Sequence, residues 1–161
     1  DFRASERTFQ LLTQVAGRAG RGDKPGKVLI QTYKCESPAI AAAAAHDFDA
    51  FFAGEVGDRE DLGYPPFGYL VAIRVDGQDA STVIRQSRKI ADVARKASES
   101  VSVLGPAETP LAKLKGRTRW HLWLRAGDRQ ELRQTVRQVL AQVEAAPGAR
   151  FAIDVDPVSA L

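Results

Sequence analysis

YLVAIRV, residues 69–75, is an apolar, partly β-branched run that predicts a strand. Residues 80 to about 98 then predict a helix, and residues 101–104 predict a short strand that ends at Gly105. We expect a loop with Pro106 and Pro110 to follow. Three more elements complete the pattern: a strand over residues 118–125, a helix from Asp128 to about Ala145 and a strand over residues 150–155.

The predicted order is β-α-β-β-α-β, which is that of the split βαβ or ferredoxin-like topology, although several folds share it. The segment from Phe67 to Leu161 has about 95 residues, a suitable length for such a domain. The sequence thus predicts an α+β chain whose residues 67–161 form a ferredoxin-like C-terminal domain.

The residues before Phe67 predict two further parts. A helix from about Glu6 to Gly20 and a strand over KVLIQTYK, residues 27–34, form the first part. One helix and one strand cannot bury a core alone, so we expect residues 1–34 to be the edge of a larger domain. Ser37 and Pro38 are typical of a helix start, and residues 35–66 are expected to form a helical connector.

Composition excludes several classes of protein. Apolar residues make up 44% of the 161 residues and charged residues 27%, which are ordinary globular proportions. No stretch of about 18 apolar residues could span a membrane, and the charged N-terminal residues do not form a signal peptide. One cysteine and two histidines argue against a disulfide scaffold and a metal centre. We therefore expect a reduced, cytoplasmic protein without a membrane partner.

Charge is unevenly distributed along the chain, although the net charge is only +3. Basic residues outnumber acidic ones between Arg85 and Arg137, whereas the charged residues of segment 47–61 are six acids and one arginine. A polyanionic partner for the second half of the chain would account for this distribution. A well-solvated surface would account for it as well.

QVAGRAGR, which begins at Gln14, is the sharpest local motif. At 100° per residue of an α-helix, Gln14, Arg18 and Arg21 fall on one narrow face. Two converging guanidinium groups suit the oxygens of an oligophosphate, and Gly17 and Gly20 would let the backbone approach it closely. The alternative is a surface helix with stray arginines and a glycine at its C-terminal cap.

This motif resembles motif VI of superfamily 2 helicases, Q-x-x-G-R-x-G-R, at every defined position. The surrounding sequence is similar to the PriA family of primosomal replication-restart helicases. Further PriA-like features continue toward the C-terminus: LGYPPF at residues 62–67, LGP at 104–106, GRTRW at 116–120 and DVDP at 154–157. The similarity therefore covers nearly the whole chain in order.

The resemblance implies the C-terminal part of an ATP-dependent 3′→5′ DNA helicase, in which residues 1–34 form the C-terminal edge of the second RecA-like helicase lobe. Such an enzyme recognises stalled or branched replication forks and initiates primosome assembly for replication restart. Its motif VI arginines reach the γ-phosphate of the nucleotide, so Arg21 would be the arginine finger and Arg18 its companion, the two predicted catalytic residues. The predicted ATP-binding residues are Gln14, Gly17, Arg18 and Arg21.

ATP and Mg²⁺ are implied as cofactors only for the full-length protein. This chain contains no Gly-x-x-x-x-Gly-Lys-Ser/Thr loop and no acidic Mg²⁺-binding motif, so alone it is expected to be inactive. The family's cysteine-rich zinc module is likewise expected only in a segment upstream. The resemblance also implies a bacterial, nucleoid-associated protein whose partners are forked and single-stranded DNA and other primosome proteins.

The predicted strand TRWHLWLR, residues 118–125, sends alternate side chains to opposite faces of a sheet. Trp120, Leu122 and Leu124 would lie on the core face. The other face would carry Arg119, His121, Trp123 and Arg125. Cations around an aromatic side chain can bind single-stranded nucleic acid, so the predicted DNA-binding residues are Lys113, Lys115 and Arg117 on the preceding loop, with Arg119 and Trp123. Alternatively, Trp123 packs under a neighbouring domain and the cations are only solvated.

Arg129 and Arg133 lie at i and i+4 near the start of the last predicted helix and face the same way. Helix N-termini favour anions. The resemblance implies that this region receives the acidic C-terminal tail of single-stranded DNA-binding protein, so these two arginines are the predicted partner-binding residues. The alternative is a pair of ordinary surface arginines.

Two other functions compete with the helicase reading. One is an ATP-independent single-stranded-DNA or protein-docking module, and the other is a small-ligand regulatory domain of ferredoxin-like shape. Motif VI argues against the first, because a pure binding module has no use for it. The basic second half and the lack of a Gly-rich ligand loop argue against the second.

Overall fold

The computed structural model describes residues 2–19 and 26–158. The chain divides into two compact units, Asp1–Leu62 and Gly63–Leu161, and each is described by itself. Among the described residues, no helix is long and apolar enough to cross a membrane. The same residues contain no group of three or more His, Cys, Asp or Glu side chains placed to hold a metal ion.

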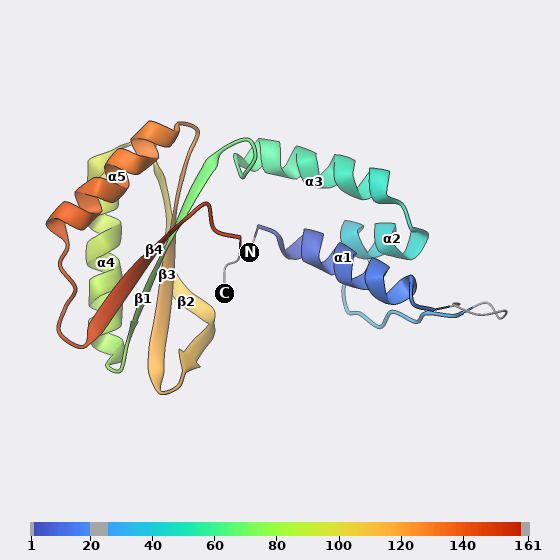
Figure 1. The fold of residues 1–161 in the computed structure, drawn as a ribbon, viewed down its shortest axis with the longest axis horizontal. Coiled ribbons are helices and arrows are strands. Elements are labelled where there is room, and N and C mark those ends of the chain that lie inside the picture. Colours follow the sequence, from blue (N-terminus) through green and yellow to red (C-terminus); the bar gives the residue numbers. More distant parts are fainter. Residues whose placement is uncertain (1, 20–25, 159–161) are drawn as a thin grey trace. The chain divides into compact units, whose positions relative to one another are not determined.

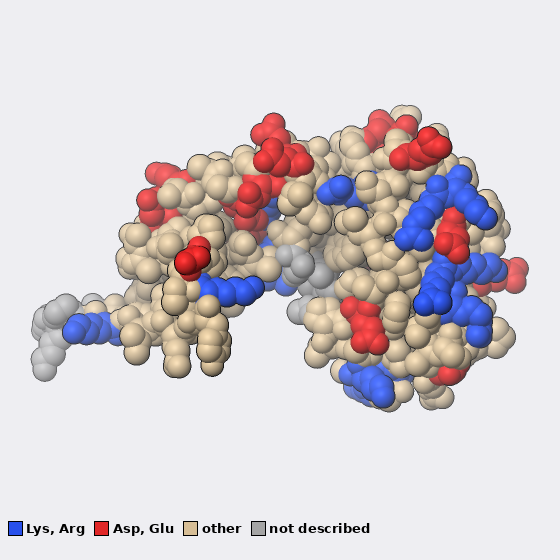
Figure 2. Space-filling model, turned by 180° about the vertical axis from the view of Figure 1, so that it is seen from behind, with Lys and Arg blue, Asp and Glu red and all other residues tan. Residues whose placement is uncertain are grey.

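The first unit is helical and consists of α1 (Ala4–Ala16), α2 (Pro38–Ala45) and α3 (Phe48–Leu62). Its small core centres on Phe9 of α1 and Phe51 of α3, whose rings stack with centroids 4.2 Å apart. The buried alanines of α2 complete this core, because their small side chains let the helices approach closely. The acidic side chains of α3 gather on one side of the unit (Figure 2).

Two predictions for the first unit are wrong. The first helix ends at Ala16 with Gly17 as its cap and does not continue to Gly20, since glycine has a low helix propensity. Residues 26–34 form no strand. A strand needs a partner for its backbone groups, and all four strands of the described residues pair with one another in the second unit.

Glu6 on α1 is held by two arginines. Its carboxylate accepts hydrogen bonds from Arg3 at 2.6 and 2.9 Å and from Arg59 of α3 at 2.8 Å. The bonds from Arg3 lower the pKa of Glu6 most, burial opposes them, and the bond from Arg59 lowers it further, from 4.5 to about 2. The ionised carboxylate thus ties α1 to α3.

We expect acid to loosen the first unit through this carboxylate. Because the pKa of Glu6 is lower in the folded than in the unfolded chain, its stabilisation is complete above pH 4.5 and is lost as the pH falls toward about 2. Amide hydrogen-exchange protection in α1, measured between pH 5 and pH 2.5, should fall in the wild type. Glu6→Gln should flatten this dependence, and an equally steep fall in that variant would contradict the assignment.

The second unit is a two-layer α+β structure (Figure 1). Its strands are β1 (Tyr69–Gly77), β2 (Ser102–Leu114), β3 (Arg117–Ala126) and β4 (Ala149–Val155). They form one sheet in the order β2-β3-β1-β4, and every neighbouring pair is antiparallel. The helices α4 (Ala80–Ala97) and α5 (Arg129–Gln142) cover one face of the sheet (Figure 1). The element order β-α-β-β-α-β is the predicted one.

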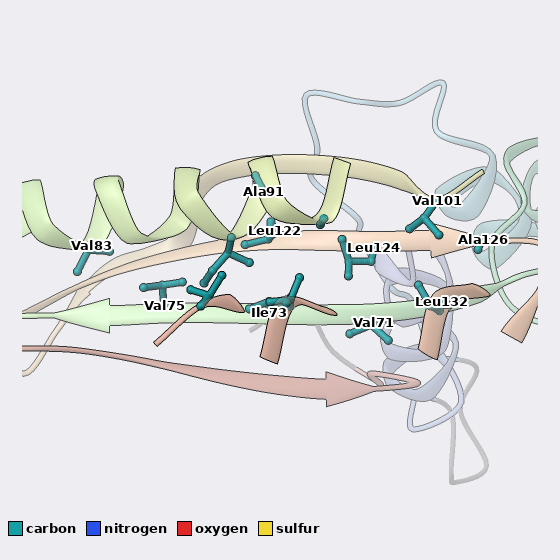
Figure 3. Close-up of a cluster of buried hydrophobic side chains, with 14 residues drawn as sticks. Val71, Ile73, Val75, Val83, Ala91, Val101, Leu122, Leu124, Ala126 and Leu132 are labelled. Carbon is teal, nitrogen blue, oxygen red and sulfur yellow. The ribbon is translucent and has the colours of Figure 1, made fainter. Parts of the chain in front are cut away.

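The core of the second unit lies between this sheet face and the two helices (Figure 3). Ile73 of β1 lies opposite Leu122 of β3, and both are fully buried. Trp120, Leu122 and Leu124 all lie on the helix-covered face, as the alternation predicted. Asp128 caps α5 by accepting hydrogen bonds from two backbone N–H groups, those of Gln130 at 2.7 Å and Glu131 at 2.9 Å.

The prediction of a loop after Gly105 is wrong, because β2 continues to Leu114. β2 is an edge strand, where proline is tolerated, and register shifts on both sides of Ala107 and Glu108 accommodate the two prolines. A two-residue turn, Lys115-Gly116, then joins β2 to β3. Both turn residues have positive φ, 49° and 74°, as a type I′ hairpin turn requires. Lys113 and Arg117 therefore lie on strands.

Candidate nucleic-acid interface

The outer sheet face is defined here as the face turned away from α4 and α5. By strand alternation it carries Arg117, Arg119, His121, Trp123 and Arg125 from β3, Arg74 and Asp76 from β1, and Arg150 from β4. Cations from three strands thus share one surface. The register places Arg119 and Arg150 on either side of Asp76.

Asp76 organises the basic side chains around it. Its carboxylate pairs with Arg117 of β3 and accepts a hydrogen bond from Arg150 of β4 at 2.9 Å. Arg117 also donates to the backbone carbonyl of Asp76 at 3.1 Å. Burial opposes ionisation of Asp76, but the bonds from Arg150 and Arg117 outweigh it and lower the pKa of Asp76. The carboxylate stays charged and fixes both guanidinium groups on the outer sheet face.

A hollow of about 240 Å³ lies beside this carboxylate. Its lining combines five basic residues, one acidic residue and two apolar ones: Arg74, Lys115, Arg117, Arg119, Arg150, Asp76, Val75 and Leu114. Guanidinium groups form bidentate bonds with phosphate oxygens, and an excess of cations favours an anionic ligand. The hollow can therefore accept a phosphate group of a polyanion.

The aromatic part of the outer sheet face lies farther along β3. His121 and Trp123 meet edge to face with ring centroids 6.0 Å apart, and both are half-buried. Burial lowers the pKa of His121, so its ring is neutral near pH 7. The guanidinium group of Arg125 lies over the ring of Tyr64 at 5.4 Å. An aromatic surface thus adjoins the basic hollow on the same strand.

The structure brings together most of the predicted DNA-binding residues. Lys115, Arg117 and Arg119 line one hollow, and Trp123 lies on the same sheet face. Lys113 does not line this hollow, because its register partner Thr118 belongs to the helix-covered face. Sequence reasoning missed three charged lining residues, Arg74, Asp76 and Arg150. Each is a charged residue within a predicted strand or directly after one, which the sequence shows. Only the register of the paired strands shows that these residues meet at one hollow.

The motif QVAGRAGR is described only in part. Gln14 lies on α1 and Arg18 in the turn after Gly17, and both side chains are exposed. The backbone N–H of Arg18 donates to the carbonyl of Val15 at 3.1 Å, so the chain tightens after the helix and one continuous helical face does not form. Within the described residues Arg18 has no ion-pair partner. Its guanidinium group is therefore available to bind a phosphate. Arg21 lies outside the described residues.

A second groove contains the predicted partner-binding arginines. It has a volume of about 470 Å³ and lies between α5 and the strands β1 and β4. Arg129, Arg133 and Arg137 form its basic side, and its apolar side chains include Tyr69, Val71, Leu132, Val136 and Val155. Arg129 lies over the Tyr69 ring at 5.6 Å and pairs with Asp156 at 3.2 Å. A basic rim above an apolar floor suits a peptide that carries both acidic and apolar side chains.

Comparison with known proteins gives consistent matches. The family model described as "Primosomal protein N C-terminal domain" matches residues 60–158. "Replication restart protein PriA" of Synechocystis sp. is 42% identical over 123 residues, which are 76% of this chain and 15% of that protein. The proteins of the same name from Bacillus subtilis and Rickettsia conorii are each 36% identical, over 87% and 99% of this chain and 18% and 24% of their own lengths. The chain thus spans less than a quarter of these relatives.

Proposed function

The chain belongs to the family of primosomal protein N C-terminal domains, and from that membership we propose that it is the C-terminal part of an ATP-dependent 3′→5′ DNA helicase. The helicase would recognise stalled or branched forks and initiate primosome assembly for replication restart. The observation that carries this proposal is the presence of QVAGRAGR in the same chain as the family match at residues 60–158.

Three parts of the chain take different roles in this proposal. Residues 1–34 are the edge of the second RecA-like helicase lobe, residues 35–66 are the connector, and residues 67–161 are the DNA- and partner-binding domain. The strand order β2-β3-β1-β4 with antiparallel neighbours supports a ferredoxin-like topology for the last part.

The motif residues act on the nucleotide's phosphates. Arg18 and Arg21 stabilise the negative charge that develops on the transferred phosphoryl oxygens, and Gln14 and Gly17 shape the cleft beside them. ATP with Mg²⁺ supplies the phosphoryl group when the complete protein binds it. The exposed side chains of Gln14 and Arg18 support this role, because neither is buried in the first unit.

The outer sheet face binds single-stranded DNA in this proposal. Phosphates would occupy the basic hollow at Lys115, Arg117 and Arg119, and bases would stack on Trp123. The excess of cations in the hollow and the adjoining aromatic rings support this binding mode over that of a small neutral ligand.

We expect two kinds of variant to separate phosphate contacts from base stacking. Lys115→Gln with Arg119→Gln should lower the salt slope of dT20 binding by about 1.4, since each phosphate contact to a single strand contributes about 0.7. Trp123→Ala should weaken binding by about 1–3 kcal/mol with an unchanged slope. Fluorescence anisotropy of the 161-residue chain with labelled dT20 at several salt concentrations measures both quantities.

Lys115 and Arg119 are chosen for this test because Arg117 is anchored to Asp76. Lys27→Gln with Lys34→Gln is the matched control, since it removes two exposed cations from the other unit. If the control lowers the slope as much, the hollow is not the binding site. Absence of dT20 binding at low salt would remove the outer sheet face from this role.

The α5 groove supports a second interaction. We assign it to the acidic tail of single-stranded DNA-binding protein, with Arg129 and Arg133 on the acidic side chains and the apolar floor under the remainder. The same groove is the observation that favours the alternative function, an ATP-independent docking module. Loss of ATP hydrolysis on mutation of motif VI, argued below, distinguishes the helicase from that module.

A further inference from the structure

The outward face of α4 carries a second basic surface, which includes none of the residues assigned above. It is a single helical stripe formed by Arg85, Arg88, Lys89, Asp92 and Lys96, with Arg95 beside it. All six side chains are exposed. Seen from behind, Lys and Arg side chains gather over the part of the molecule where α4 lies (Figure 2).

The stripe points away from the sheet. The opposite side of α4 contributes Val83, Ile90, Ala91 and Ala94 to the core, all fully buried. Because α4 packs on the helix-covered face, its stripe and the outer sheet face lie on opposite sides of the unit (Figure 1). The unit therefore presents cations on two separate surfaces.

Most of the positive charge on this stripe is not neutralised locally. The one acidic side chain, Asp92, pairs with Arg95 at 3.5 Å. Arg85 donates to the hydroxyl of Thr82 at 3.0 Å. Among the described residues Arg88, Lys89 and Lys96 have no ion-pair partner. From Arg85 to Lys96 the stripe is about 16 Å long, at 1.5 Å per residue, and it can meet several phosphates of a nucleic-acid backbone.

The chemistry of the stripe differs from that of the outer sheet face. No large apolar side chain of α4 is exposed; Ile84 and Val93 are half-buried along a shallow groove. Single strands are usually held in part by aromatic stacking, and α4 contains no aromatic side chain. A duplex keeps its bases stacked inside and offers phosphates alone.

We propose that the α4 stripe binds the phosphate backbone of duplex DNA. The choice of DNA rests on the proposed function, but the stripe is independent of the single-strand site. With a single strand on the outer sheet face and a duplex on α4, one unit holds the two kinds of DNA segment that meet at a branch.

Salt-dependent binding of a labelled 20-base-pair duplex to the 161-residue chain tests the proposal. Each phosphate contact to B-DNA contributes about 0.9 to the slope, so Arg88→Gln with Lys89→Gln should lower it by about 1.8. Between 50 and 200 mM salt, the affinity advantage of the wild type over the variant should then shrink about twelvefold. Arg85→Gln with Lys96→Gln should act in the same direction. All four side chains are exposed, and tryptophan fluorescence verifies that the variants fold.

The control variant Lys27→Gln with Lys34→Gln should leave the duplex slope unchanged, and the two α4 variants should leave dT20 binding unchanged. Equal losses for duplex and dT20, or no loss for duplex, would overturn the proposal. Binding of poly-glutamate that depends on Arg88 and Lys89, without such dependence for duplex, would instead assign the stripe to an acidic protein. Failure of the single-strand site would appear in the dT20 binding of the wild type and of the Lys115/Arg119 and Trp123 variants, whereas failure of the α4 stripe would appear in duplex binding of the α4 variants, so the two failures are distinguishable.

Discussion

Replacing Arg21 with alanine in the complete protein should lower the rate of ATP hydrolysis by a factor of about 10³–10⁵, the usual cost of losing an arginine finger. The guanidinium group acts on charge that develops only in the transition state, so kcat should fall while nucleotide binding changes little. DNA binding should remain nearly intact, because the basic hollow lies in the other unit. Steady-state DNA-stimulated hydrolysis and anisotropy with dT20 measure the two effects.

Arg21→Lys is the informative companion to this variant. Lysine keeps the charge but not the planar fork that holds two phosphate oxygens, so activity should stay far below that of the wild type. Lys27→Ala removes a nearby cation outside the motif and should hydrolyse ATP normally. A rate within tenfold of wild type for Arg21→Ala would remove Arg21 from the role and would favour the docking module.

The elements of the second unit were predicted correctly where the local sequence pattern and the burial of one face favour the same structure. Alternation in residues 118–125 correctly assigned the faces of β3, because one face must be apolar to pack against the helices. The start of the last helix at Asp128 was also predicted correctly, because its carboxylate accepts hydrogen bonds from the backbone N–H groups of Gln130 and Glu131. These features depend on neighbours within a few residues.

Predictions failed where a distant or absent partner decides the structure. KVLIQTYK has the composition of a strand, but residues 26–34 have no neighbouring strand among those described. The two prolines of β2 predicted a loop, yet β3 supplies a partner that holds β2 in register up to Leu114. Composition alone does not reveal such pairing.

In the candidate site, too, residues close together in the sequence were predicted and residues brought together by strand pairing were missed. The residues on and before β3 were found as a basic and aromatic cluster within a short window. Arg74 and Arg150 were missed, because they reach the hollow only through the pairing of β1 with β3 and β4. Asp76 was missed as well, although it holds Arg117 and Arg150 in place. A site on a sheet face depends on which strands pair, and the local sequence of one strand does not reveal its partners.

Leu122→Ala should destabilise the second unit by about 2–5 kcal/mol, the range for large-to-small changes in cores. Leu122 is fully buried on β3, one of the two central strands, and lies opposite Ile73 between the sheet and the helices (Figure 3). The substitution would leave a cavity. Because strand pairing fixes the backbone that carries the neighbouring side chains, this cavity can collapse only partly. In urea, this loss corresponds to a midpoint lower by about 1–3 M.

Tryptophan fluorescence isolates this transition, since both tryptophans of the chain, Trp120 and Trp123, lie on β3 in the second unit. Leu140→Ala on α5 is the matched control, because it deletes the same atoms from a side chain that is 56% exposed. It should shift the midpoint little, as surface changes usually alter stability by less than about 0.5 kcal/mol. Equal shifts of the urea midpoint for the two variants would mean that Leu122 is not enclosed in the core. The sheet would then be too loosely packed to hold the arginines of the outer sheet face in fixed positions.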